Sequence, residues 1–301
     1  MTLTELRYIV TLAKTEHFGK AAEICFVSQP TLSVAIKKLE QELNVAIFER
    51  KKSSVQTTDI GRAIIEQAKL TLAQAQVIKE IALSNKDQLN TPLKVGAIHT
   101  IGPYLFPHLV HAMREIAPKM PLYIEENFTR GLRAKLLEGK LDAIIVALPF
   151  SEPDIVTSTL YREDFLMLLN QDHPWCERKE ISTAQLADTE LLMLGEGHCF
   201  RDQILESYMS LQQVINQQHK ATEGSSLETI RMMVASGLGS SVIPKSAAKG
   251  SANDGLKTVP FSAPVPGRTV ALAWRASFPR TKAINALLSA LNKLAREGSI
   301  N

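Results

Sequence analysis

The pattern of hydrophobic and polar positions predicts two short helices joined by a tight turn near the N-terminus. Ala21 and Ala22 are small, so the first helix can lie close against its neighbour. Phe26-Val27 marks the turn, and Ser28 can cap the second helix by accepting a backbone N–H bond. An apolar stripe at helical spacing follows in the second helix, at Leu32, Ile36, Leu39 and Leu43. Such a pair has the size that fits the DNA major groove.

The polar face of the second helix carries short polar side chains near its N-terminus and a cation further along, which suits base edges and phosphates. Candidates for DNA contact are Gln29, Pro30, Thr31 and Ser33 at the bases, Lys20, Lys37, Arg50 and Lys51 at phosphates, and the capping residue Ser28 beside them. Arg50 and Lys51 belong to a predicted hairpin over 47–57 whose basic tip is typical of a wing. The alternative is an ordinary amphipathic helix pair with a solvated polar face.

A long helix is predicted next, from about Ile60 to Leu83, with Thr58 as its cap. Small or apolar residues alternate at spacings of four and three, as in a coiled coil, at Ile64, Ala68, Thr71, Ala75, Ile78 and Ala82. We therefore expect a dimerising linker helix followed by a polar hinge over 84–91. Dimerisation would present two recognition helices to a roughly symmetric operator.

From residue 92 onwards, apolar strands alternate with helices. The predicted strands lie at 93–100, 122–125, 141–148, 165–169, 190–194, 241–243 and 269–274, and the helices at 103–116, 130–138, 199–209, 227–235 and 282–294. This alternation implies a parallel sheet covered on both faces. The grouping of the strands indicates two α/β lobes, and a cleft between lobes is the usual small-molecule site.

Composition limits the functional classes. The chain has 301 residues, of which 45% are hydrophobic and 22% charged, as in ordinary globular proteins. A net charge of +3 does not distinguish nucleic-acid binders, so only the basic cluster at 50–52 speaks for DNA. The chain has no stretch of ~20 apolar residues, so we expect no membrane span. The N-terminus lacks the pattern of a signal peptide, and three cysteines without paired spacing favour a reducing compartment, so we expect a cytoplasmic protein.

One cysteine stands in a reactive context. Cys199 follows two glycines and begins a predicted helix, so its thiol faces the positive end of the helix dipole. His198 and Arg201 add positive potential, and these features predict a lowered thiol pKa. The alternative is a buried, inert cysteine. His108 and His111 have helical spacing but no further ligand beside them, so we expect neither a metal site nor a cofactor.

Residues 1–60 resemble the winged helix-turn-helix of LysR-type transcriptional regulators, and the resemblance extends over essentially the whole chain. The residues that carry it are Ala21-Ala22, Ser28–Ser33, Lys38-Leu39-Glu40, Leu43 and Phe48-Glu49-Arg50. The implied fold is α+β multidomain, with a C-terminal two-lobed α/β effector domain like that of periplasmic binding proteins. The expected domains are a winged helix-turn-helix at 1–59, a linker helix and hinge at 60–90, and the effector domain at 91–301, with lobe I at 91–163 and 268–301 and lobe II at 164–267.

The segment Gly197–Gln203 is similar to the sensing loop of the peroxide-responsive members of that family. Further matching segments are Gly102–Pro107, Glu125-Glu126, Asp172–Trp175, Ser226–Thr229, Arg231 and Gly237–Gly239. The resemblance implies that hydrogen peroxide oxidises Cys199 to a sulfenic acid. It implies a peroxide pocket formed by Thr100, Thr129, Gly197, His198, Arg201 and Asp202.

The chain departs from those members at one position. They carry a resolving cysteine nine residues after the reactive one, and here that residue is Tyr208. Three possibilities stay open. Cys199 stops at sulfenic acid or is capped by a small thiol; Cys176 or the Cys199 of a second chain resolves it; or disulfide sensing has been lost.

The resemblance therefore implies a DNA-binding regulator of oxidative-stress genes rather than an enzyme. Its expected partners are double-stranded DNA with a pseudo-palindromic operator, RNA polymerase, hydrogen peroxide as the signal, and copies of itself in a tetramer built as a dimer of dimers. One alternative is a regulator that binds a small effector in the inter-lobe cleft, with Cys199 incidental. Another, from a different class, is a thiol peroxidase.

Overall fold

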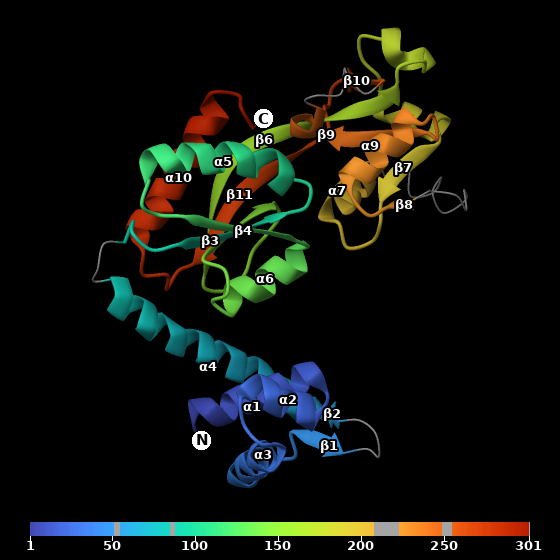
Figure 1. The fold of residues 1–301 in the computed structure, drawn as a ribbon. Helices are drawn as coiled ribbons and strands as arrows, with labels where there is room; N and C mark the ends of the chain where they lie inside the picture. The colour runs from blue at the N-terminus through green and yellow to red at the C-terminus, as the bar shows by residue number, and fades with distance from the viewer. Residues whose placement is uncertain (51–54, 85–87, 208–222, 249–254, 301) are drawn as a thin grey trace. The chain divides into compact units, whose positions relative to one another are not determined.

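The computed structural model describes residues 1–50, 55–84, 88–207, 223–248 and 255–300 (Figure 1). The chain forms two compact units. Met1–Asn85 belong to the first unit, and Lys86–Leu136 with Lys140–Asn301 form the second. The first unit has one hydrophobic core and the second has two. The domain limits expected from the sequence stay predictions.

The first unit is a helical domain with a small hairpin. Its elements are α1 (Leu3–Thr15), α2 (Phe18–Cys25), α3 (Gln29–Leu43), β1 (Phe48–Arg50), β2 (Val55–Thr57) and α4 (Asp59–Ser84). Ser28 caps α3 by accepting a hydrogen bond from Thr31 N, and Asn44 ends it in a left-handed conformation. The Glu40 carboxylate accepts bonds from Ile47 N and Phe48 N, which ties α3 to the hairpin. The predicted helix pair and hairpin are confirmed, and Lys51 at the hairpin tip lies outside the described residues.

Two predictions about apolar stripes need correction. Leu43 is not buried with the rest of the α3 stripe, because it lies in the last turn and is 37% exposed. In α4, Ala68 is buried in the core of the first unit and Ile64 packs against that core. The first part of the predicted coiled-coil stripe is therefore used within the chain and is not available for dimerisation. The exposed apolar residues towards the end of α4 are Leu70, Ile78 and Ile81. Because helical residues eight and three apart share a side, these three form a stripe on that helix.

The second unit is built on a nine-stranded sheet. Its strands are β3 (Leu93–Ile98), β4 (Leu122–Asn127), β5 (Ala143–Ala147), β6 (Ile155–Asn170), β7 (Leu191–Leu194), β8 (Glu223–Gly224), β9 (Ser240–Pro244), β10 (Leu256–Pro260) and β11 (Gly267–Arg275). The order is β4-β3-β5-β11-β6-β9-β7-β8, with β10 also paired to β6. The long β6 pairs with β11 up to Asp164 and with β9 and β10 from Phe165 onwards, so it runs through both lobes.

The expectation of a parallel sheet is only partly right. β3 pairs in parallel with β4 and β5, and β7 pairs in parallel with β8 and β9. β11 is antiparallel to both β5 and β6, and β6 is antiparallel to β9 and β10. The sheet is mixed because β6 and β11 carry the chain from one lobe to the other and back, in opposite directions.

Helices cover the sheet in both lobes (Figure 1). In the first lobe α5 (Gly102–Ile116) and α10 (Thr281–Arg296) pack side by side, while α6 (Thr129–Leu137) contributes Leu132 against Gly96 of β3. The second lobe contains α7 (Cys199–Ser207), α9 (Leu227–Ala235) and the short helices Pro174–Glu177, Thr183–Asp188 and Lys245–Ala248. Its core is separate and includes Phe165, Phe200 and Ile230.

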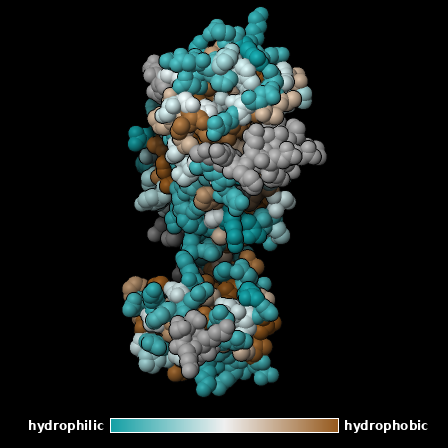
Figure 2. Space-filling view, turned by 90° about the vertical axis from the view of Figure 1, so that its right-hand side faces the viewer, coloured by the Kyte–Doolittle hydropathy of each residue, from teal (hydrophilic) through white to brown (hydrophobic). Residues whose placement is uncertain are grey.

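The surface agrees with the hydropathy of the sequence. Within the described ranges, no helix is both long and apolar enough to span a bilayer. On the face drawn in Figure 2, hydrophilic residues cover most of each unit and hydrophobic ones are scattered among them.

Candidate functional site

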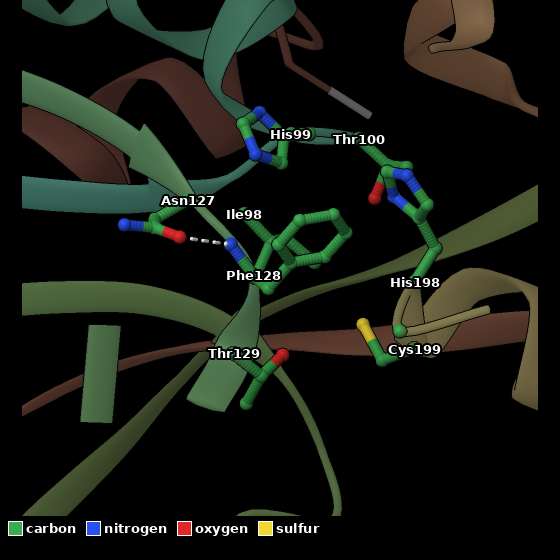
Figure 3. Close-up of a pocket in the computed structure, with 9 residues that line it drawn as sticks. Ile98, His99, Thr100, Asn127, Phe128, Thr129, His198 and Cys199 are labelled. Carbon is green, nitrogen blue, oxygen red and sulfur yellow. Dashed lines mark hydrogen bonds between the residues drawn. The ribbon is translucent and has the colours of Figure 1, made fainter. Parts of the chain in front are cut away.

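A cavity in the second unit lies at the ends of two parallel strands. Because Ile98 of β3 is in register with Asn127 of β4, the residues that follow each strand lie side by side. The start of α7 completes the cavity from the other lobe. Its lining residues are Ile98, His99, Thr100, Asn127, Phe128, Thr129, Gly197, His198 and Cys199 (Figure 3). A ligand crevice at the carboxyl ends of parallel strands is a general feature of α/β folds.

Local structure places Cys199 at the first position of α7, as the sequence predicts. The preceding turn needs a glycine, because Gly197 has a φ of 91°, which side chains rarely adopt. The next residue, Phe200, is buried against Phe165 with ring centroids 4.9 Å apart, which anchors the helix start in the second core. The Cys199 side chain itself packs against the core of the first lobe. The thiol is therefore held between the two lobes of this unit.

The electrostatics of the thiol differ from the prediction. Burial raises the pKa of Cys199, while the Thr129 hydroxyl and the Arg268 guanidinium act in the opposite direction. The prediction that His198 and Arg201 lower the pKa of the Cys199 thiol is wrong, because neither is among the groups that favour its thiolate. The cation that does act on the thiol is Arg268, which the sequence analysis did not single out.

Arg268 lies at the centre of a fully buried polar network. Its guanidinium donates to Thr100 Oγ1 at 2.7 Å and to the Thr100 carbonyl at 2.8 Å. It also pairs with Glu163 at 2.8 Å, and neither side chain is exposed. Glu163 in turn accepts a bond from Ser246 N at 2.9 Å. The network orients the Thr100 hydroxyl in the cavity wall and keeps a buried cation near Cys199.

An aromatic cluster forms another wall of the cavity. The His198 ring lies 4.7 Å from the Phe128 ring and 5.9 Å from the His99 ring, centroid to centroid. Burial, together with neighbouring His99, lowers the pKa of His198, so the ring is uncharged near neutral pH. His99 Nδ1 lies 3.8 Å from a Glu126 carboxylate oxygen. His99 and Phe128 are further cavity residues that the sequence analysis missed.

Two residues predicted for the pocket are not among its lining residues. Arg201 pairs with Glu223 and donates to the Leu194 carbonyl at 3.1 Å. It lies about half a helical turn from Cys199 on α7, which directs it to the other side of the helix. Asp202 is exposed. Thr100, Thr129, Gly197 and His198 do line the cavity with Cys199, as expected.

Thr129 gives the cavity an unsatisfied polar atom. It stands at the start of α6, and in Figure 3 its hydroxyl points towards the side on which the Cys199 sulfur lies. Its Oγ1 is buried and makes no hydrogen bond of normal geometry in the described structure, although it is near enough to lower the thiol pKa. A buried hydroxyl without a partner costs free energy unless a bound molecule satisfies it. The arrangement therefore suits a small molecule with hydrogen-bonding oxygens next to the sulfur.

The remaining cysteines do not approach this arrangement. All three cysteines are free thiols. Cys25 packs in the first unit, and Cys176 packs in the core of the second lobe, where its thiol donates to the Asn170 carbonyl. Tyr208, at the expected resolving position, lies outside the described residues. Among the described histidines, cysteines and carboxylates, no group could hold a metal ion, and both His108 and His111 are exposed.

The predicted DNA-contact residues lie on and beside α3. Gln29, Pro30, Thr31 and Lys37 are exposed on that helix, and Lys20 is exposed on α2. Ser33 is half-buried. The hydroxyls of Ser28 and Thr31 lie 2.8 Å apart at the helix cap. Arg50 ends β1, and its side chain, like all of Lys51, lies outside the described residues.

Both units match models of one protein family. Residues 3–62 match the bacterial regulatory helix-turn-helix of the LysR family, and residues 86–296 match the LysR substrate binding domain. The fold and the two matches define the class: the chain belongs to the LysR-type transcriptional regulators. The predicted fold class and family are thereby confirmed.

Within that family the chain is homologous to OxyR. It is 39% identical over 280 residues to the DNA-binding transcriptional dual regulator OxyR of Escherichia coli K12, covering 93% of this chain and 91% of that protein. It is 34% identical over 293 residues to the hydrogen peroxide-inducible genes activator of Haemophilus influenzae, covering 97% and 96%.

Solved structures agree. A full-length OxyR of Pseudomonas aeruginosa with a cysteine-to-aspartate substitution has 58% identity and a TM-score of 0.75, covering 97% of this chain and 94% of that one. A hydrogen peroxide-bound cysteine-to-serine mutant of Corynebacterium glutamicum OxyR has 34% identity and a TM-score of 0.66, covering 99% and 94%.

Proposed function

We propose that this regulator responds to hydrogen peroxide through Cys199 and controls oxidative-stress genes. The observation that carries the proposal is the placement of the thiol beside the Thr100, Thr129 and His198 side chains, with Thr129 Oγ1 left unpaired. Relatives over nearly the full length are peroxide-inducible gene activators, and one related structure holds hydrogen peroxide. A LysR-type regulator that responds to a larger effector molecule would not require a thiol in this cavity.

The proposed reaction is a two-electron oxidation of sulfur. The Cys199 thiolate attacks one peroxide oxygen, so that an S–O bond forms and the O–O bond breaks. The departing oxygen leaves as hydroxide and takes up a proton to become water. The Thr129 hydroxyl is free to bond the peroxide, and the Thr100 hydroxyl, which accepts from Arg268, can donate its own hydrogen to the departing oxygen.

Within the described residues, no second cysteine lies beside Cys199 to form a disulfide with its sulfenic acid. Cys176 packs in a different core from Cys199 and donates to Asn170, so we assign it no part in resolution. We propose that the sulfenic acid persists or forms a mixed disulfide with a small thiol. The larger side group then no longer fits the cavity wall, and α7 and the preceding turn repack. That local change would alter the arrangement of protomers.

We propose that several chains associate in the DNA-bound form. We propose a dimer through α4 and a tetramer built as a dimer of dimers, which places two pairs of recognition helices on a pseudo-palindromic operator. The exposed apolar residues of α4 support such a contact. RNA polymerase is the proposed partner in activation.

The test is footprinting of the full chain on its own promoter region, reduced and peroxide-treated, with wild type beside Cys199→Ser. We expect peroxide to change the length or spacing of the wild-type footprint and to leave the variant footprint unchanged. Mass spectrometry with a sulfenic-acid trap should find the modification at Cys199. A Cys199 that stays reduced while the footprint changes would contradict the proposal, and so would equal peroxide responses of both proteins. Sustained peroxide turnover with a reductant would instead favour a thiol peroxidase.

A further inference from the structure

One residue on the outer face of α3 has an unexpected side chain. Val34 is 69% exposed in the middle of a helix whose buried stripe includes Leu32 and Ile36. At 100° per residue, it points almost directly away from that stripe. Helix stability does not account for it, because alanine and lysine are better helix formers than the β-branched valine. The side chain gains little from packing within the domain.

The residues around Val34 identify the kind of surface to which it belongs. Pro30 and Thr31 lie one turn before it, and Lys37 and Lys38 lie one turn after it, all exposed. On α2 the exposed cation Lys20 stands one turn from the exposed carboxylate Glu23, so the positive excess of this surface comes from α3 itself. The nearest exposed carboxylate towards the end of the helix, Glu42, is already paired with the amino terminus. This charge distribution is complementary to phosphates, so DNA is the occupant that suits the face.

The chemistry of valine restricts what it can recognise there. Its side chain has no donor or acceptor, so it cannot form a hydrogen bond with a base edge. The apolar group that the major groove offers is the 5-methyl of thymine. Opposite any other base, Val34 would cover polar groups without replacing their bonds to water, which is unfavourable. Contact of a base with Val34 therefore favours binding to thymine over binding to the other three bases.

We propose that Val34 is a specificity-determining residue that reads the methyl group of one thymine in each operator half-site. The inference rests on the proposed function in one respect, namely that α3 enters the major groove. It does not depend on how Cys199 senses peroxide.

The experiment replaces thymine by deoxyuridine, which removes the methyl group and leaves the other major-groove groups in place. The full chain first selects duplexes from a random-sequence pool, and each thymine of a selected half-site is then replaced singly. We expect one position per half-site at which the substitution weakens binding about fourfold, the loss for one buried methyl group. In Val34→Ala the effect at that position should disappear, since its small side chain no longer reaches the methyl.

Two further variants complete the test. Lys37→Ala should weaken binding to every duplex and keep the wild-type response to deoxyuridine, since it removes a phosphate contact alone. Val34→Thr, which has the same shape, reports on folding and should retain part of the response. The inference is overturned if no thymine responds, or if Val34→Ala responds like the wild type. If the chain enriches no DNA from the pool, the proposed function is overturned as well. That result differs from the loss of the Val34 inference alone, in which DNA is still enriched.

Discussion

At the residue scale, the chemistry of Cys199 is determined by residues distant in sequence. Burial works against the thiolate, and the buried Arg268 together with Thr129 works for it. Thr100 receives its orientation from the same arginine. The sequence alone does not single out this pair, because Glu163 stands between Arg162 and Asp164 in β6 and Arg268 shares β11 with Arg275. Burial distinguishes them, since charged residues are rarely fully buried unless they are paired.

We therefore predict that the buried pair controls the reactivity of Cys199. Replacing both partners, Glu163→Gln with Arg268→Met, removes the cation without leaving an unpaired buried carboxylate. The thiol pKa should rise, because a positive charge that favours the thiolate is lost. Alkylation of Cys199 and its oxidation by peroxide should both slow several-fold at pH 7.

The measurement is the pH dependence of Cys199 alkylation in the full chain, with Cys25 and Cys176 replaced by serine. Arg162→Met is the matched control, since this arginine lies on β6 next to Glu163 but its side chain is 56% exposed. An alkylation profile shared by the double variant and the wild type would mean that Arg268 has only a structural role.

At the element scale, α4 combines two functions along its length. Its first turns pack on the core of the first unit through Ile65 and Ala68. Further along, Leu70, Ile78 and Ile81 are exposed at 45%, 69% and 54%, which places an apolar stripe on the surface of a long helix. An exposed apolar stripe on a long helix is typical of a helix that associates with a copy of itself.

We predict that Ile78→Lys with Ile81→Lys weakens dimerisation by at least tenfold. Both side chains are exposed and near the helix C-terminus, where cations are tolerated, so the stability of the single chain should change by less than about 0.5 kcal/mol. Sedimentation velocity over a range of concentrations measures the association. Gln76→Lys places the same charge on the opposite side of α4 and should leave the dimer intact. Equal association of the double variant and the control would exclude α4 as the interface.

At the scale of the whole molecule, the unfolding of the second unit can be measured separately from that of the first. Both tryptophans of the chain, Trp175 and Trp274, belong to the second unit, so tryptophan fluorescence follows the unfolding of that unit alone. In the same unit, burial lowers the pKa of His173 and His198 below the ordinary value of 6.5. Each histidine is therefore harder to protonate in the folded unit than in the unfolded chain.

The sign of the resulting pH dependence follows directly. Above pH 6.5 both states are mostly unprotonated and the unit keeps its full stability. As the pH falls below 6.5, the unfolded chain binds protons that the folded unit does not, so stability is lost. We predict that His198→Gln reduces the slope of unfolding free energy against pH between 7 and 5 by up to one proton. Exposed His111→Gln is the control, and an unchanged slope in His198→Gln would refute the assignment.

The sequence by itself determined the local elements and the class of protein. Helix caps, apolar spacing and turn residues act within a few residues, so the helix-turn-helix, its cap at Ser28, the hairpin and the helix start at Cys199 were all predicted correctly. The motifs around these elements were enough to recognise the family, because they lie in continuous stretches of the chain.

Only the tertiary structure decided what surrounds the sulfur. Arg268 follows Thr100 by 168 residues, yet the two are hydrogen-bonded, because β6 and β11 carry the chain between lobes and return it beside β5. Arg201 stands two residues from Cys199 and is turned away by the helix. Desolvation and the distance between charges govern a pKa, and neither is encoded in separation along the chain.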